Sequence, residues 1–260
     1  MSNQRHLFVP DVQLRKGVPT AHLEWLAYYA YDRGPTRIIL AGDWWDFPSL
    51  SSYDKPGSKS TEGRRVSSDI DVGRREMYRL VNFWHHRGWL PEVHFLFGNH
   101  ENRWAKVANE NPALLDGLAD PFACLGELGV ISHPFLKPIT LDGVAYAHFF
   151  PHNVKGAITQ SKNGAPSARA QVQRLMRSAT AGHQQGYDIA VVPTPDGLQR
   201  GLIAGSFYLH DESYMPVNNY WRGMVLKNNV RRGDYAITEI DMTYLESTYG
   251  RLAPRNSRYA

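Results

Sequence analysis

The chain has almost no cysteine and no long apolar stretch. Cys124 is the only cysteine among 260 residues, which excludes an intrachain disulfide and favours a reducing compartment. We expect Cys124 to be a small buried apolar residue. No run of about 18 apolar residues could span a membrane, and residues 1–6 lead into a predicted strand without the apolar core of a signal peptide. The sequence therefore predicts a cytoplasmic protein with no membrane partner.

Internal repeats and domain linkers are lacking as well. With 42% hydrophobic residues the chain can bury a sizeable core, so we expect a single domain over residues 1–260. The formal net charge is +4. A basic balance favours polyanionic partners such as nucleic acid without requiring one, and many basic proteins bind nothing acidic.

Several apolar runs of the sequence end at residues that can bind metals or transfer protons. Residues 42–46 follow the run 38–41, and residues 98–101 follow the run 93–97. Because open α/β sheets build their sites at the carboxyl ends of strands, these loops are expected at one sheet edge. Each loop alone is more typical of a turn with solvated acids, and that alternative stays open. Three further runs end at Asp11, at His148 and at residues 182–185.

Taken in order, these blocks resemble those of one enzyme family. They read Asp11-Val12-Gln13, Gly42-Asp43-Trp44-Trp45-Asp46, Gly98-Asn99-His100-Glu101, His148 and Gly182-His183-Gln184-Gln185. The calcineurin-like metallophosphoesterases carry Asp-x-His, Gly-Asp-x-x-Asp, Gly-Asn-His-Glu, a lone His and Gly-His-x-His in the same order. The resemblance covers residues 7 to about 205. It implies an α/β fold, the four-layer αββα sandwich of two mixed sheets called the metallo-dependent phosphatase fold.

The resemblance also implies roles for individual residues. Two divalent ions would supply an activated hydroxide and neutralise phosphoryl charge. Asp43 would bridge the ions and Asp11 would bind the first of them, while the second would take Asn99, His148 and His183. His100 would protonate the leaving group, and Asp46 would hold its other ring nitrogen. The alternative for His100 is a packed loop residue.

Two positions depart from the family pattern, and both belong to the first ion. Gln13 and Gln185 stand where the family has histidines. If their amide oxygens bind the metal, the harder donors favour Mn²⁺ first and Mg²⁺ next, ahead of Zn²⁺ or iron, and the first ion should be labile. Alternatively neither Gln binds, and the first ion is held by Asp11, Asp43 and water or is absent. His22 and His210 are candidate replacements that nothing in the sequence places.

Substrate contacts are predicted from basic and aromatic residues near these loops. Residues 48–65 form either a surface loop without structure or a substrate-facing flap carrying Tyr53, Lys55 and Lys59. The tryptophans near the predicted rim could stack on bases or belong to the core. Basic residues around 155–177, which follow His148 and include Lys155 and Lys162, could face the metals or solvent. The substrate-binding residues that we predict are Arg103, Arg64, Arg65 and Trp45.

Periodicity and turn residues predict most of the secondary structure. Helices are expected over residues 19–33, 66–86, 101–109 and 167–177, with Thr20 as a cap and Gly34 as a stop for the first. A small strand is expected around 130–131, and a hairpin of two strands over 189–206. Final strands are expected at 220–223 and 235–240, joined by a charged hairpin that includes Lys227, Arg231 and Arg232.

Together these features predict a metal-dependent phosphoester hydrolase, acting as a phosphodiesterase or DNA nuclease. One alternative is a phosphomonoesterase acting on small molecules or phosphoproteins with the same residues. The other is a binding module without catalysis, in which the two glutamines have abolished the first ion. The sequence leaves the oligomeric state open.

Overall fold

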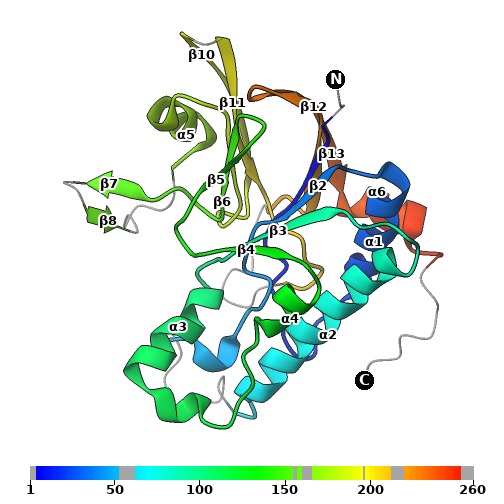
Figure 1. Cartoon of the computed structure of the whole chain (residues 1–260), viewed down its shortest axis with the longest axis vertical. Coiled ribbons are helices and arrows are strands. Elements are labelled where there is room, and N and C mark those ends of the chain that lie inside the picture. The colour runs from blue at the N-terminus through cyan, green and yellow to red at the C-terminus, as the bar shows by residue number, and fades with distance from the viewer. Residues whose placement is uncertain are drawn as a thin grey trace.

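The computed structural model describes residues 4–52, 62–154, 157–159, 166–195, 197–211 and 220–252. Within these ranges the chain is a mixed α/β structure with two mixed sheets, as the sequence predicted (Figure 1). None of the described helices combines the length and hydrophobicity needed to cross a membrane. The predicted contacts Tyr53, Lys55 and Lys59 lie outside the described residues, and so do Lys155 and Lys162.

The first sheet has six strands in the order β13-β12-β1-β2-β3-β4. Strands β1 to β4 run parallel, so their carboxyl ends meet at one edge, while β12 and β13 are antiparallel additions beside β1. The bounds are β1 His6–Val9, β2 Arg37–Leu40, β3 Glu92–Leu96, β4 Ile131–His133, β12 Gly223–Arg231 and β13 Asp234–Asp241.

The second sheet has five strands in the order β10-β11-β9-β6-β5, of which β11, β9 and β6 are parallel. A separate antiparallel pair, β7 and β8, follows β6 in the chain. The bounds are β5 Ile139–Leu141, β6 Val144–Ala147, β7 His152–Val154, β8 Ala157–Thr159, β9 Ala179–Ala181, β10 Tyr187–Thr194 and β11 Gly197–Ala204.

The described helices connect and cover these strands. Their bounds are α1 Ala21–Arg33, α2 Val66–His85, α3 Glu101–Glu110, α4 Ala123–Glu127, α5 Ala168–Leu175 and α6 Met242–Tyr249, with short 3₁₀ turns at Pro48–Leu50 and Pro112–Leu115. Helix α1 ends at Gly34 as predicted, where φ of 52° lies in the left-handed region. Thr20 occupies the position before α1, but its side chain makes no capping hydrogen bond.

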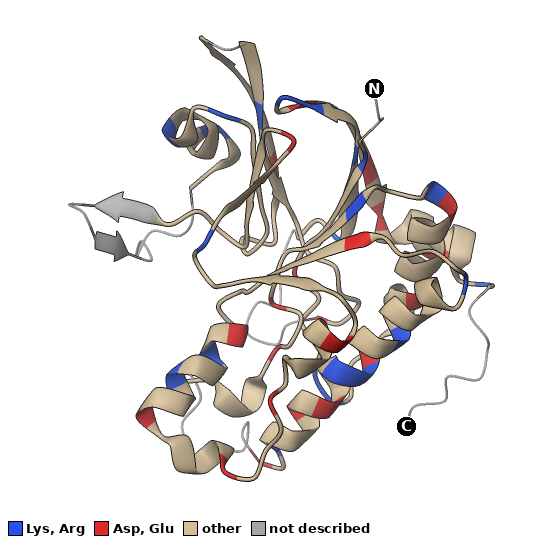
Figure 2. Cartoon of the chain, viewed as in Figure 1, with Lys and Arg blue, Asp and Glu red and all other residues tan. Residues whose placement is uncertain are grey.

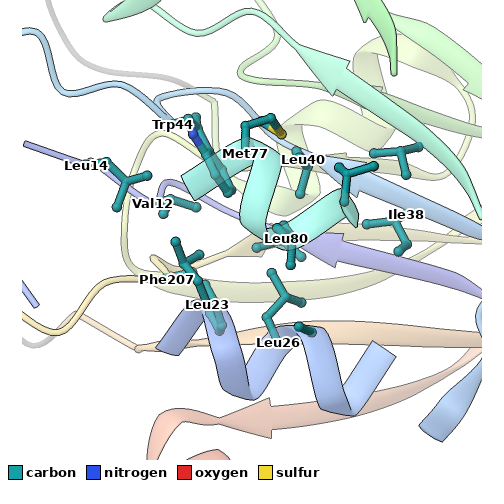
Figure 3. Close-up of a cluster of buried hydrophobic side chains, with 14 of the residues drawn as sticks. Val12, Leu14, Leu23, Leu26, Ile38, Leu40, Trp44, Met77, Leu80 and Phe207 are labelled. Carbon is teal, nitrogen blue, oxygen red and sulfur yellow. The ribbon is translucent and has the colours of Figure 1, made fainter. Parts of the chain in front are cut away.

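Strand alternation sorts the apolar side chains between two cores. In β1, Leu7 and Val9 face the helices, while Phe8 faces the second sheet. Figure 3 shows the helix side, where Leu26 of α1 and Leu80 of α2 pack with Ile38 and Leu40 of β2 and their neighbours.

The second core lies between the sheets, where Phe8, Ile39 and Leu96 of the first sheet meet Tyr146 and Leu202 of the second. A third cluster joins Ala168 of α5 to the outer face of the second sheet. Helices therefore cover the outer face of each sheet, and the sheets pack on one another.

Some elements differ from the prediction. Helix α6 and the strands β5, β7 and β8 were not predicted, because they are short and carry weak patterns. Strand β12 begins at Gly223, later than expected, since Arg222 forms only an isolated bridge with Ser206. The prediction that Lys227 belongs to a charged hairpin is wrong, because Lys227 lies fully buried within β12.

Candidate metal centre

The loops predicted to meet do come together, and they come from both sheets. Asp43 follows β2, and its Oδ2 lies 3.4 Å from Nε2 of His148, which follows β6. The same His148 nitrogen lies 2.9 Å from Oδ1 of Asn99 after β3 and 3.2 Å from Nδ1 of His183 after β9. Asp11 after β1 joins through its Oδ1, which accepts a 2.8 Å hydrogen bond from the backbone N–H of His183. The carboxyl ends of parallel strands thus assemble this centre.

Three of these side chains converge as metal ligands would. Donor atoms of Asp43, His148 and His183 all lie within 4.8 Å of one another, and in the described part of the chain no other group of three His, Cys, Asp or Glu side chains does so. Asp43 and His148 are buried. A carboxylate oxygen with two imidazole nitrogens is a donor set that divalent transition metals use, so these residues fit one such ion.

His148 is oriented for this role by the backbone. Its Nδ1–H donates a 2.8 Å hydrogen bond to the carbonyl of Ala41, which directs Nε2 toward the cluster. A second partner of this kind is the usual way to fix a ligating histidine. Burial by itself would lower the pKa of His148, but the carboxylates of Asp43 and Asp11 outweigh it and raise the pKa to about 9. An ion bound at Nε2 would therefore displace the proton that this ring holds at physiological pH.

His183 has the opposite electrostatic environment. Burial, followed by the neighbouring His148, lowers its pKa to about 4. Its ring is therefore neutral at physiological pH, which is the form that binds a metal.

Asp43 lies at the middle of the centre. Its Oδ1 accepts a hydrogen bond of 2.9 Å from the backbone N–H of His100, and its carbonyl accepts from the N–H groups of Val12 and Gln13. Burial would raise the pKa of Asp43, but the imidazoles of His100 and His148 hold that pKa well below its usual range. Asp43 is thus an ionised carboxylate that contacts both the metal donors and the predicted proton donor.

Strained backbone is concentrated at the same place. Gln13, Asp43, His183 and Gln185 all have φ between 49° and 66°, in the left-handed region that non-glycine residues seldom adopt. Such strain is characteristic of functional sites, where the surrounding structure holds it in place.

Glu101 belongs to the block at residues 98–101, but the sequence reasoning gave it no role. Its buried carboxylate accepts backbone hydrogen bonds from Asp43, Trp44, Trp45 and Gly98, at 2.8 to 3.0 Å. Burial, together with the charge of Asp43, raises the pKa of Glu101 to about 7. The available signal was an acidic residue at the first position of the predicted helix after a strand-end loop.

The predicted pair of His100 and Asp46 is also formed. Nδ1 of His100 lies 3.0 Å from Oδ1 of Asp46, as an ion-pair contact rather than a well-aligned hydrogen bond. Arg15, which the sequence analysis did not single out, contacts the other oxygen of Asp46 at 2.7 Å. Burial would raise the pKa of Asp46, but His100 and Arg15 lower it to about 2. Burial lowers the pKa of His100, yet Asp43 and Asp46 raise it overall.

The four predicted substrate-binding residues lie in different environments. Trp45 cannot stack on a substrate, and that prediction is wrong, because its ring is fully buried against Phe47 and Phe122. Arg103 lies at the centre, where it donates to the carbonyls of Asp46 and Phe47 and approaches Nε2 of His100 to 3.0 Å. Arg64 donates to the carbonyl of Pro48, and the exposed Arg65 donates to that of Arg64.

The remaining predicted ligands lie on the side of Asp11. Gln13 reaches Asp43 through its backbone N–H, at 2.7 Å. Oε1 of the buried Gln185 accepts a 2.8 Å hydrogen bond from the hydroxyl of Tyr208. Oδ2 of Asp11 has no hydrogen-bond partner among the described residues, and burial raises the pKa of this carboxyl to about 6.

Comparison with protein-family models gives no match for this chain, and a search of curated proteins likewise finds no similar sequence.

Proposed function

We propose that this chain is a metal-dependent phosphoester hydrolase of the calcineurin-like metallophosphoesterase type. The observation that carries the proposal is that Asp43 contacts both the candidate metal ligands and the predicted proton donor, His100. Asp43 belongs to the converging donors, with Oδ2 3.4 Å from His148, and its Oδ1 holds the backbone of His100, the predicted proton donor. In this proposal the two packed sheets and their outer helices form the four-layer αββα sandwich of the metallo-dependent phosphatase fold.

A divalent ion on Asp43, His148 and His183, with Asn99 beside them, would activate water and neutralise charge on the phosphoryl oxygens. We keep the expectation of Mn²⁺ first and Mg²⁺ next, which rests on hard amide oxygens from Gln13 and Gln185, although the two imidazoles of this set also suit softer divalent ions. Zn²⁺ and iron rank lower in this expectation.

The residues of the chain itself supply the proton. In its charged form His100 would donate from Nε2 to the leaving oxygen, which replaces the contact in which Nε2 accepts from the Arg103 guanidinium. Asp46, 3.0 Å from Nδ1, fixes the ring and stabilises that charged form. Arg15 holds the second oxygen of Asp46 at 2.7 Å and so keeps that carboxylate ionised. Arg103, with its guanidinium 3.0 Å from Nε2 of His100, can bind a phosphoryl oxygen next to the leaving group.

The substrate in this proposal is a phosphodiester, with DNA as the polymer. Exposed Arg169, Arg174 and Arg177 on and after α5 support it, and Figure 2 shows basic residues on this helix. Gln184 connects the start of this segment to the metal loop by a 2.9 Å hydrogen bond to the carbonyl of Pro166. A reducing, cytoplasmic compartment is part of the same proposal, since Cys124 is buried and unpaired.

A substrate panel tests the reaction class. Hydrolysis of bis-p-nitrophenyl phosphate, p-nitrophenyl phosphate and labelled single- and double-stranded DNA is compared in Mn²⁺, Mg²⁺ and Zn²⁺. We expect the diester and DNA to be cleaved, fastest in Mn²⁺, and DNA binding to weaken steeply with salt. Turnover of the monoester alone would replace this function by that of a phosphomonoesterase, and no turnover would leave a binding module.

Leaving-group dependence tests the role of His100. A nitrophenolate leaves without protonation, whereas a nucleotide oxygen requires a proton. His100→Ala should therefore slow DNA cleavage about 10² to 10⁴-fold and bis-p-nitrophenyl phosphate cleavage far less. His86→Ala, at the exposed end of α2, is the matched control and should change neither rate. Equal losses on both substrates would remove His100 as the acid.

A further inference from the structure

The two sides of the centre offer very different donors. On one side, donor atoms of Asp43, His148 and His183 lie within 4.8 Å of one another, and Oδ1 of Asn99 lies 2.9 Å from Nε2 of His148. These four side chains make a complete set for one ion, since retained metals commonly have three or four protein ligands.

Among the described residues, the other side lacks a comparable set of His, Cys, Asp or Glu donors. Asp11 belongs to no group of three convergent His, Cys, Asp or Glu donors in the described ranges. Its Oδ1 holds the backbone N–H of His183 at 2.8 Å, which leaves Oδ2 as its one uncommitted oxygen. Asp11 and a shared Asp43 would give two carboxylates, and such a pair binds an ion firmly only when waters and substrate phosphates complete the shell.

The side-chain amide of Gln185 makes a hydrogen bond within the protein. Its Oε1, the atom that would bind a metal, accepts the hydroxyl of Tyr208 at 2.8 Å. Tyr208 is fully buried, and its ring stacks on that of His210 with centroids 4.5 Å apart, so its hydroxyl is held in place. Oε1 of Gln185 is thereby already engaged as a hydrogen-bond acceptor.

Among the described residues, no histidine joins Asp11 and Asp43 in place of the missing ligands. His22 packs edge-on against Phe207, with ring centroids 5.3 Å apart, and His210 stacks on Tyr208. Neither joins Asp11 and Asp43 in a convergent group within the described part of the chain. The two candidates left open by the sequence therefore do not complete a second site.

We propose that the resting protein holds one divalent ion, on Asp43, His148, His183 and Asn99. A second ion is not retained, because the hydrogen bond from Tyr208 engages the oxygen of Gln185 that would be its ligand. This inference rests on the proposed function for the presence of the first ion. In it, Asp11 is a positioning residue that holds the left-handed loop of His183.

Metal stoichiometry tests the inference without any assay of activity. Equilibrium dialysis against Mn²⁺, with the metal counted per chain, should give one ion, and any second ion should bind at least 100-fold more weakly. The electron paramagnetic resonance spectrum of the bound Mn²⁺ should be that of an isolated ion. Two ions of comparable affinity, with the exchange-coupled spectrum of a pair about 3.5 to 4 Å apart, would overturn the inference.

A variant that restores both histidines tests the cause. Gln13→His combined with Gln185→His should retain two Mn²⁺ per chain and give the coupled spectrum. Gln184→His is the matched control, because Gln184 is turned away to Pro166, and it should still retain one. A double variant that retained one ion would show that the glutamines are not the cause and would overturn that assignment.

Failure of the inference and failure of the proposed function give different results. Two ions in the wild-type chain together with phosphoester hydrolysis would remove the inference alone. No bound ion and no hydrolysis would remove both.

Discussion

Glu101 fixes two loops of the candidate centre at once. Its carboxylate oxygens accept the N–H groups of residues 43–45 after β2 and of Gly98 after β3. The loops that carry Asp43 and Asn99 therefore share one buried acceptor. Because every one of these N–H groups is buried with its carboxylate, removing an acceptor oxygen leaves donors unsatisfied.

Substitution of Glu101 measures this effect. Glu101→Gln replaces one oxygen, which accepts two N–H groups, by an amide NH₂. We expect a loss of about 2 to 4 kcal/mol in the free energy of unfolding, measured in urea. Glu110→Gln, at the exposed end of α3, is the control and should stay within about 0.5 kcal/mol of the wild type. Equal stability of the two variants would contradict the role given to Glu101.

Gly98 makes room for the carboxylate of Asp43. A Cβ at this position would overlap Asp43 Oδ1 and would lie 2.6 Å from the backbone nitrogen of Asp43. Gly98→Ala should therefore displace Asp43 and weaken Mn²⁺ binding at least about tenfold, with hydrolysis reduced about 100-fold. Gly186→Ala is the matched control, since a Cβ there meets nothing within 4 Å. Unchanged Mn²⁺ affinity in Gly98→Ala would rule out this account of the loop.

Strand β12 carries an unusual element of the inter-sheet core. The amine of Lys227 is fully buried, donates to the hydroxyl of Thr180 and lies 3.3 Å from that of Tyr146. It also lies over the rings of Tyr146 and Tyr235, at 4.3 and 4.6 Å from their centroids. Burial lowers the pKa of this amine well below its ordinary value.

The buried amine of Lys227 makes the free energy of unfolding decrease as the pH falls. Below about pH 10.4 Lys227 binds a proton in the unfolded state of the protein but not in the folded state. The unfolded state is therefore favoured as the pH falls toward the folded pKa of Lys227. As the pH falls below about 10, the wild type should therefore lose up to about 1.4 kcal/mol per pH unit relative to Lys227→Met, until the folded lysine also binds its proton. Urea unfolding at several pH values measures both chains, and parallel pH profiles would contradict a neutral buried amine.

Among the helices and strands, local sequence patterns predicted those that have strong periodicity or clear turn residues. Helices α1 and α2 follow from apolar spacing, and the strand-end loops follow from short apolar runs that stop at polar residues. Trp45 was misjudged because its burial depends on Gly73, in the middle of α2, where a Cβ would overlap the indole. Glu101 and Arg15 act through partners that folding brings near, which a linear pattern does not show.

Across the whole molecule, the candidate ion site joins the two sheets. Asp43 and Asn99 follow strands of the first sheet, and His148 and His183 follow strands of the second. An ion bound to all four would therefore act as a cross-link between the sheets of the native state only. Binding that is confined to the native state stabilises it by mass action.

Thermal unfolding tests this coupling. At an Mn²⁺ concentration 100 times the dissociation constant the gain is about 2.7 kcal/mol, and for a chain of this size Tm should rise by roughly 5 to 10 °C. The shift should disappear in Asp43→Ala and be reversed by a chelator. An equal shift in Asp43→Ala would place the stabilising ion elsewhere.

The central claim is that Asp43 and its neighbours form a metal-dependent phosphoester hydrolase centre, and one measurement tests it most directly. Hydrolysis of bis-p-nitrophenyl phosphate in Mn²⁺ is compared between the wild type and Asp43→Ala, with circular dichroism confirming that both are folded. The account predicts wild-type turnover that a chelator abolishes, and a rate at least about 100-fold lower in Asp43→Ala. A folded Asp43→Ala that retained the wild-type rate, or turnover indifferent to the chelator, would contradict it.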